Sequence, residues 1–143
     1  MNDDALRGFA RAFCDALTLR DPQRIAPYLH EDIDWTGFGP IDLFPFLGRR
    51  HSIRAVLQVC SEIADMIELK ECVPESMLVA GDQAAALMRV NALLRKNGKP
   101  ISLRLAQFIQ LRDGKVASVR MMLDSFDAAE QVLGRAIDLT TAA

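Results

Sequence analysis

Gln107 is the first candidate for chemistry in this chain, because it is the polar residue on an otherwise apolar strand face. Alternating residues from Leu103 to Leu111 would turn one side inward, and Gln107 interrupts that side. An unsatisfied buried amide costs roughly 1–3 kcal/mol, so the side chain must find a partner. It is therefore either bonded to neighbouring groups or water, or it contacts a ligand in a cavity.

Trp35 is the second candidate. Asp34 and Thr36 would occupy the opposite side of a short strand, which turns the indole ring inward. The ring then either packs in the core or uses its indole N–H to orient a ligand.

The other reactive side chains form no catalytic pattern. Asp34 is expected at the surface, and Asp124 on the outer side of its strand, where it could start a helix or pair with an arginine. His30 and His51 lie near element ends, where histidine is usually structural or solvated. No cluster has metal-ligand spacing and no glycine-rich phosphate loop is present, so we expect no metal and no cofactor.

The composition and net charge of the chain exclude several classes of protein. The 143 residues are 50% hydrophobic and 25% charged, with a net charge of −2, which is typical of one globular domain spanning residues 1–143. A slightly acidic chain is a poor nucleic-acid binder. No apolar run approaches the roughly 20 residues that cross a bilayer, and the acidic N-terminus does not resemble a signal peptide. We therefore expect a cytoplasmic protein without nucleic-acid or membrane partners.

The three cysteines point to no metal site or disulfide framework. Cys14, Cys60 and Cys72 are odd in number and their spacing fits no zinc motif. We interpret them as reduced, structural thiols.

The first half of the chain has helical periodicity. A helix is predicted over about residues 3–19, a shorter one after Asp21-Pro22, and a third over about 51–66. The apolar stripe of the first helix comprises Leu6, Phe9, Ala10, Phe13, Ala16 and Leu17.

The segment 37–48 follows neither the helical nor the strand period. It carries Phe38, Phe44 and Phe46, and an apolar loop needs a surface to cover. The loop either packs onto the core or forms a lid over a ligand cavity.

The second half predicts antiparallel strands joined by hairpins. Asn97-Gly98 favours a two-residue turn with Lys96 opposite Lys99. The pairs that follow are Leu94 with Ile101, Ala92 with Leu103, Val90 with Leu105 and Met88 with Gln107.

For the last hairpin, a two-residue turn at Asp113-Gly114 would mismatch the apolar faces, because a one-residue slip turns every side chain over. We therefore predict a three-residue loop, 112–114, with Gly114 in the left-handed conformation. That loop keeps Val119, Met121 and Leu123 inside. A short C-terminal helix follows, capped by Ser125 or Asp127 and ending at Gly134.

Helices followed by strands indicate an α+β fold, and the order of elements resembles the cone-shaped NTF2-like fold, specifically its SnoaL-like and ketosteroid-isomerase-like branch. The resemblance covers about residues 4–134. Its markers are Asp21, His30-Glu31-Asp32, Gly48, Ile53-Arg54, Asn97-Gly98-Lys99-Pro100 and the segment 125–130.

This resemblance implies a curved, mostly antiparallel sheet wrapped around three N-terminal helices, followed by a short C-terminal helix. The interior of the cone would bind a small apolar molecule. Its expected lining is Phe13, Leu17, Trp35, Phe44, Phe46, Val90, Ala92, Leu94, Leu103, Leu105, Gln107, Val119, Met121 and Leu123.

The catalytic groups of the relatives do not transfer. By resemblance, the isomerase tyrosine, base and acid positions hold Phe13, Gly37 and Gln107. Limonene-epoxide-hydrolase relatives place an aspartate after an arginine, whereas Arg120 is followed here by Met121. Three hypotheses stay open: a binding protein, a diverged isomerase, cyclase or hydrolase acting on a small hydrophobic carbonyl compound, and a scaffold whose cone is filled by aromatic rings.

The outer sheet face mixes arginines with apolar residues such as Leu87, Phe108 and Met122. Such a mixture suits a protein–protein interface, and the resemblance implies a homodimer through this face.

Overall fold

The computed structural model describes residues 2–141, so residues 1 and 143, the ends of the expected domain, lie outside the described residues. The elements in chain order are α1 (Asn2–Leu19), the 3₁₀ helix η1 (Pro22–Tyr28), β1 (Leu29–Phe38), β2 (Gly48–Arg50), α2 (Ile53–Met66), β3 (Ile67–Ala80), β4 (Gln83–Leu94), β5 (Pro100–Arg112), β6 (Lys115–Leu123), α3 (Ser125–Leu133) and the 3₁₀ helix η2 (Leu139–Thr141).

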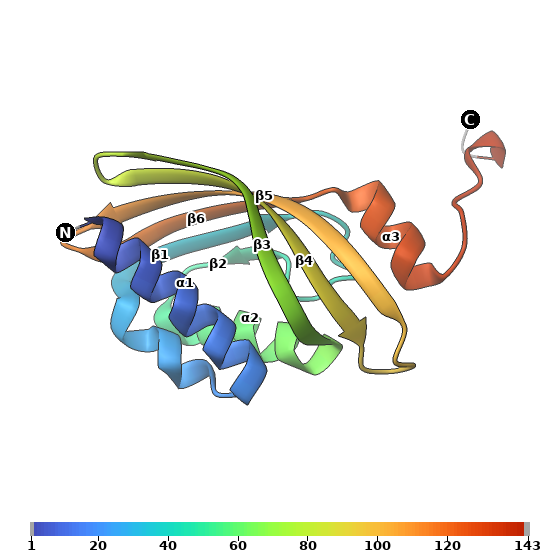
Figure 1. Ribbon diagram of the computed structural model, residues 1–143, viewed down its shortest axis with the longest axis horizontal. Coiled ribbons are helices and arrows are strands. Elements are labelled where there is room, and N and C mark those ends of the chain that lie inside the picture. Colours follow the sequence, from blue (N-terminus) through green and yellow to red (C-terminus); the bar gives the residue numbers. More distant parts are fainter. Residues whose placement is uncertain (1, 142–143) are drawn as a thin grey trace.

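The strands form one open, curved sheet in the order β2-β1-β6-β5-β4-β3. β1 pairs with β6 in parallel, and all other neighbouring strands are antiparallel. The sheet bends around α1, η1 and α2, while α3 follows the end of β6 and packs beside the first residues of β5 (Figure 1). The predicted α+β architecture, with a curved, mostly antiparallel sheet around the N-terminal helices, is confirmed.

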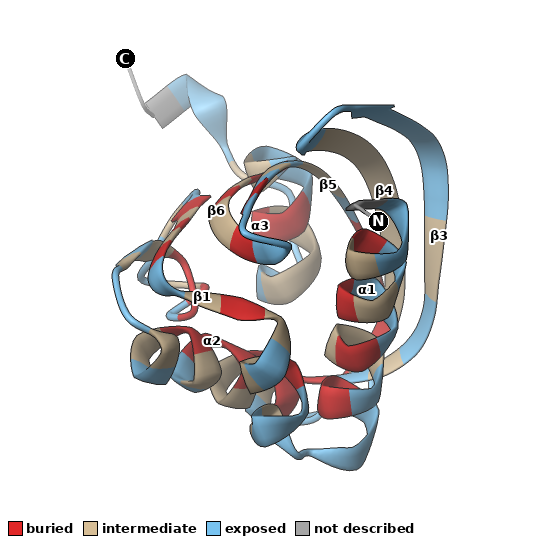
Figure 2. Cartoon of the chain, turned by 90° about the vertical axis from the view of Figure 1, so that its left-hand side faces the viewer, coloured by how far each residue is buried: buried red, intermediate tan, exposed pale blue. Residues whose placement is uncertain are grey.

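The apolar core lies between the concave face of the sheet and the helices. Buried residues of α1 and α2 face the inner side of the strands (Figure 2). Helical spacing explains why α1 packs there, since Leu6, Phe9 and Ala16 lie on one side of it. Ala10, which we expected on this stripe, is exposed, and Ala12 is buried in its place.

The β4–β5 hairpin has a longer loop than predicted. The Leu94 N–H donates to the Lys99 carbonyl at 2.9 Å, which leaves a four-residue loop, 95–98, with Gly98 at φ 70°. The predicted pairing of Lys96 with Lys99 is therefore wrong. Observed pairs are Ala92 with Ile101, Val90 with Leu103, Met88 with Leu105 and Ala86 with Gln107. Because the shift is two residues, every side chain stays on its predicted face.

The β5–β6 hairpin corrects a second prediction. Arg112 lies opposite Lys115, so the turn contains two residues, Asp113 and Gly114, at φ 55° and 73°. The positive φ of Gly114 is confirmed, but the three-residue loop is wrong. The extra residue is instead Ala117, which forms a bulge between the pairs Leu111–Val116 and Gln110–Ser118. This bulge turns Val119, Met121 and Leu123 inward.

Three helix termini can be compared with their capping residues. The N-cap of α3 is Asp124, whose side chain makes no cap hydrogen bond, so the predicted caps Ser125 and Asp127 are wrong. The helix ends as predicted at Gly134, at φ 73°. For α2, the Ser52 hydroxyl accepts a hydrogen bond from the Ala55 N–H at 3.0 Å and fixes its start.

Strand β3 forms one edge of the sheet and is irregular. Its register with β4 shifts between Leu69 and Glu71 and again between Pro74 and Ser76. Lys70 and Glu75 are therefore extra residues, and Cys72, between the two bulges, faces the same side as Val90.

The described residues contain no helix that is long and apolar enough to cross a membrane.

Candidate functional site

Strands β4, β5 and β6 supply the floor of the candidate site. Gln107 lies between Ala86 on β4 and Met121 on β6. The concave face is more accessible over the middle of β4 and β5, where Val90, Leu105 and Gln107 are half-buried, than beside the 95–98 loop. The buried candidates on this face are Ala92, Leu94, Leu103, Val119, Met121 and Leu123.

Strand β1 extends this floor beside β6, with Trp35 next to Val119, and helix α1 and the 37–48 loop supply the opposite side. Phe13 and Leu17 come from α1, Trp35 from β1, and Phe44 and Phe46 from the loop. All the apolar candidates of both sides belong to one cluster, with Phe13, Val90 and Leu105 packed at its margin.

Trp35 brings an unpaired donor into this cluster. The residue is 3% exposed, and its indole Nε1 is buried without a protein hydrogen-bond partner. Its ring stacks on Phe13 and meets Phe9 edge-on, with centroids 6.3 Å apart. A buried donor that lacks an acceptor is costly. An acceptor atom on a bound molecule would remove that cost.

Gln107 is held only weakly by the protein. Its amide Nε2 donates to the sulfur of Met88 at 3.1 Å, and a thioether is a weak acceptor. Met88 lies diagonally across the strand pair and not opposite, because of the two-residue shift in register. A ligand carbonyl could replace this contact with a stronger one.

Sequence reasoning missed two residues at this site. Phe9 lies one helical turn before Phe13, and this i, i+4 spacing could have identified it as the second ring beside Trp35. Met88 depends on the register, and the turn sequence alone gave the wrong register.

The 37–48 loop packs on the core. Phe44 is fully buried, Phe46 is 6% exposed, and their rings meet edge-on at 5.8 Å. The Phe44 N–H donates to the Pro40 carbonyl, and Leu47 fills the space beside Gly37. These contacts favour the interpretation of a packed loop over that of a lid. Phe38 is the exception, being 49% exposed on the outer side of β1.

No acid is available inside the cluster. Among the described residues, none that is polar or charged is fully buried. Asp34 lies on the outer side of β1, where its carboxylate meets Arg120 at 3.1 Å and Arg49 at 3.4 Å. Asp124 and His51 are exposed. General acid–base chemistry therefore has no obvious carboxylate or imidazole here.

His30 makes local contacts away from the cluster. Its Nδ1 accepts a hydrogen bond from the Asp32 N–H at 3.0 Å, and its Nε2 lies 3.7 Å from Asp113. In residues 2–141, no group of three or more His, Cys, Asp or Glu side chains is arranged to hold a metal ion.

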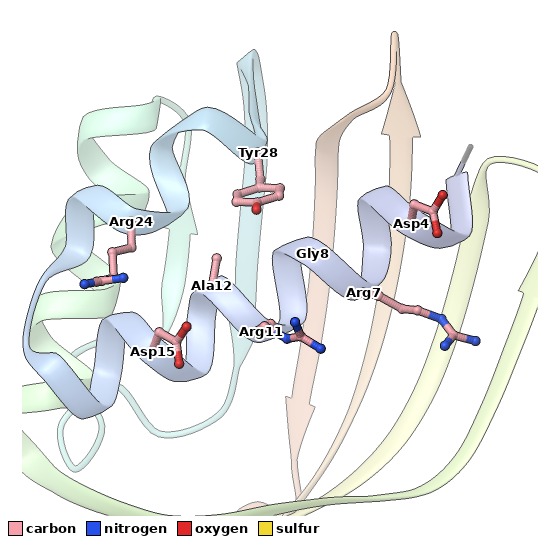
Figure 3. A pocket seen from close by; sticks show the side chains of 8 residues that line it. All are labelled: Asp4, Arg7, Gly8, Arg11, Ala12, Asp15, Arg24 and Tyr28. Carbon is pink, nitrogen blue, oxygen red and sulfur yellow. The ribbon is translucent and has the colours of Figure 1, made fainter.

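A separate groove of about 430 Å³ lies between α1 and η1 (Figure 3). Close approach of Gly8 to Tyr28 shapes it, since a Cβ at Gly8 would lie 2.8 Å from the tyrosine ring. Its charged lining does not suit an apolar ligand, and no predicted site residue lines it. The lining residues are Asp4, Arg7, Gly8, Arg11, Ala12, Asp15, Arg24 and Tyr28.

Comparison with known proteins shows which family and which solved structures this chain resembles. The family model described as a SnoaL-like domain matches residues 10–119. No match was found among the curated proteins. A solved structure from Rhodopseudomonas palustris, provisionally named an isomerase, is 40% identical with a TM-score of 0.88, over 92% of this chain and 97% of that chain.

Two more distant structures share the fold. TerC, co-crystallised with polyporic acid, is 16% identical with a TM-score of 0.75, over 92% of this chain and 98% of that one. An LEH-like epoxide hydrolase of M. tuberculosis is 15% identical with a TM-score of 0.69, over 99% of this chain and 98% of that one.

Proposed function

The chain belongs to the SnoaL-like domain family, and from this premise we propose that it binds a small, mostly apolar molecule carrying a hydrogen-bond acceptor. The observation that carries the proposal is the buried indole N–H of Trp35, unpaired within an apolar cluster. An apolar site with one or two oriented polar groups is the usual form of a small-molecule site. Gln107 supplies the second polar group.

Binding is preferred over catalysis because no described carboxylate is buried in the cluster. The alternative is a diverged isomerase, cyclase or hydrolase acting on a small hydrophobic carbonyl compound. The isomerase and epoxide hydrolase names of similar structures favour it. To distinguish binding from catalysis, the protein is incubated with ketones or epoxides, and chromatography measures whether any product forms.

The binding proposal is tested with pairs of small ketones and the matching hydrocarbons. Trp35 is the only tryptophan, so its fluorescence reports on the site directly. We expect Gln107→Leu to weaken ketone binding by roughly 0.5–1.5 kcal/mol, the net value of one hydrogen bond, and to leave hydrocarbon binding little changed. For Trp35→Phe, calorimetry replaces fluorescence and the same selectivity is expected.

The matched control is Gln110→Leu, an exposed glutamine on the outer side of the same strand. Gln110→Leu should leave the binding of both the ketones and the hydrocarbons unchanged. Equal losses for ketones and hydrocarbons in the Gln107 variant would make that amide structural. If neither series binds to the wild-type protein, the scaffold hypothesis is preferred.

We further propose that two copies associate through the outer sheet face. Phe38, Phe108 and Met122 are between 42% and 50% exposed there, on adjacent strands β1, β5 and β6. Exposed apolar residues gathered in this way commonly mark an interface. We also propose the cytoplasm as its location, since the three free cysteines suit a reducing compartment.

A further inference from the structure

The charged groove between α1 and η1 is a second cavity, separate from the apolar cluster (Figure 3). Its volume of about 430 Å³ is sufficient for a small molecule. Helix α1 supplies Arg7, Arg11 and Asp15 to its lining, at intervals of four residues. Each of these three residues is therefore about 6 Å further along the helix axis than the one before, on the same side of the helix.

Gly8 allows the Tyr28 ring to lie close against α1. A Cβ atom at position 8 would lie 2.8 Å from Cε1 of the ring and 3.4 Å from its hydroxyl oxygen, so any other residue would displace the tyrosine. Glycine inside a helix is unfavourable relative to alanine. Here it occurs at the point where the Tyr28 hydroxyl reaches the groove.

Four polar groups that line the groove are unpaired. Among residues 2–141, Arg7, Arg11 and Asp15 make no ion pair, and the Tyr28 hydroxyl makes no hydrogen bond. Arg7 and Arg11 are one helical turn apart, where like charges repel each other. An anion bound between the two guanidinium groups would remove this repulsion.

The other charged residues of the groove are already engaged. The Arg24 guanidinium lies 3.5 Å from the Asp21 carboxylate, and Asp4 has an interaction within the protein. The groups that remain for a ligand are therefore two cations, one hydroxyl and one carboxylate. A ligand that complements them carries two negative charges and one positive charge.

We propose that this groove is a second ligand site, which binds a small organic anion that also carries an ammonium group, such as an acidic amino acid or a phosphorylated amine. The carboxylate or phosphate oxygens accept hydrogen bonds from Arg7, Arg11 and the Tyr28 hydroxyl, and the ammonium group pairs with Asp15. The site is independent of the binding proposal for the apolar cluster, because none of the ligand contacts expected there lines the groove.

The single tyrosine and the single tryptophan of the chain report on the two sites separately. Tyr28 lines the groove, whereas Trp35 is buried in the apolar cluster. We expect millimolar O-phosphoethanolamine or glutamate, added to the full-length protein at pH 7, to shift the NMR signals of the Tyr28 ring and to leave Trp35 emission unchanged. The tighter of the two compounds shows whether phosphate or carboxylate is the preferred anion. The absence of a Tyr28 shift with both compounds would overturn the proposal.

Probes that carry only one kind of charge test the class of ligand. Inorganic phosphate lacks the ammonium group, and ethylamine lacks the anion. Each should bind at least tenfold more weakly than O-phosphoethanolamine, because a charged hydrogen bond is lost. Phosphate or ethylamine binding as tightly as O-phosphoethanolamine would show that the assigned ligand class is wrong.

Variants assign the two charges to residues. Arg11→Gln should weaken the binding of O-phosphoethanolamine and of inorganic phosphate at least tenfold, whereas Asp15→Asn should weaken only O-phosphoethanolamine. The matched controls are Arg54→Gln on α2 and Asp3→Asn on α1, since both residues are exposed and neither lines the groove. Both controls should bind as the wild type does.

Unchanged Trp35 emission in each variant verifies that the fold is intact, because all four substituted residues are exposed. O-phosphoethanolamine affinity that is unaffected by Arg11→Gln would overturn the assignment of the anion site. Affinity for the same compound that rises in Asp15→Asn would show that no ammonium group meets this carboxylate.

Discussion

The indole ring of Trp35 stacks on the phenyl ring of Phe13, with centroids 5.8 Å apart and planes inclined by 16°. This contact joins the first helix to the first strand and covers the face of the candidate ligand-orienting group. The position of Phe13 on α1 therefore determines how the indole ring of Trp35 is packed.

Removing that ring should loosen the site. We expect Phe13→Ala to lower the free energy of unfolding by about 2–4 kcal/mol, because a large, half-buried aromatic side chain is deleted. Trp35 emission should shift to longer wavelength as water reaches the indole. Phe126→Ala is the control, since Phe126 is 46% exposed on α3, and it should change neither quantity appreciably. An unshifted emission in Phe13→Ala would mean that the stack does not shield Trp35.

Steroid double-bond isomerisation should be absent. Phe13, Gly37 and Gln107 occupy the isomerase positions, and proton abstraction from carbon needs a base that none of them supplies. Absorbance assays on a standard unsaturated ketosteroid should show no turnover. Activity comparable to that of a true isomerase would show that these positions were wrongly assigned.

Gly37→Asp should not restore the reaction. A Cβ at this position would lie 2.7 Å from a methyl carbon of Leu47 and 3.4 Å from its Cα, so the loop must shift to accept it. We expect a loss of about 1–3 kcal/mol in unfolding free energy, measured by urea denaturation. A variant as stable as the wild type would indicate that the loop yields easily.

The Asp34–Arg120 pair should make stability depend on pH. Burial raises the pKa of Asp34, but the hydrogen bond and charge of Arg120, with the charge of Arg49, outweigh burial and hold the pKa below its usual range. The stabilisation is therefore complete above the unfolded-state pKa, roughly 3.9, and is lost as pH falls through the folded-state value.

Asp34→Asn tests this pH dependence. We expect it to destabilise by about 1 kcal/mol at pH 6, with the difference from wild type shrinking below about pH 4. Asp32→Asn is the control, because the Asp32 side chain is 70% exposed and its pair with Arg112 is long, at 3.4 Å. A difference that grows toward acid pH would contradict the assigned sign.

The proposed dimer can be tested by measuring the mass of the protein in solution. Light scattering at micromolar concentration should give twice the 15.9 kDa chain mass. Phe108→Asp should give the monomer mass, because it places a charge among exposed apolar residues of the sheet. Phe126→Asp, on α3, should remain dimeric. A monomeric wild-type protein would reject the proposal.

The sequence predicted which face of the sheet each strand side chain occupies better than it predicted which residues pair across neighbouring strands. The β4–β5 register, and the β5–β6 register beyond the Ala117 bulge, differ from prediction by two residues, an even number, so the inward set survived. The 95–98 loop is held from outside the hairpin, since the Arg95 N–H donates to the Met66 carbonyl and its guanidinium to the Ala64 carbonyl. Such tertiary contacts cannot be read from turn residues.

The candidate site was predictable in composition but not in detail. Alternation and helical spacing identified the apolar lining, because burial follows those periods. The unpaired state of the Trp35 indole and the sulfur contact of Gln107 depend on side-chain packing between distant segments. Local patterns carry no information about that packing.

The irregularities of β3 have a consequence for growth of the sheet. A long, regular edge strand would offer its free N–H and C=O groups to another chain, which is how runaway strand addition begins. Here Lys70 and Glu75 interrupt the spacing, and Pro74 lacks an N–H altogether. The opposite edge, β2, is only three residues long. Both ends of the sheet are thus poor templates for amyloid-like extension.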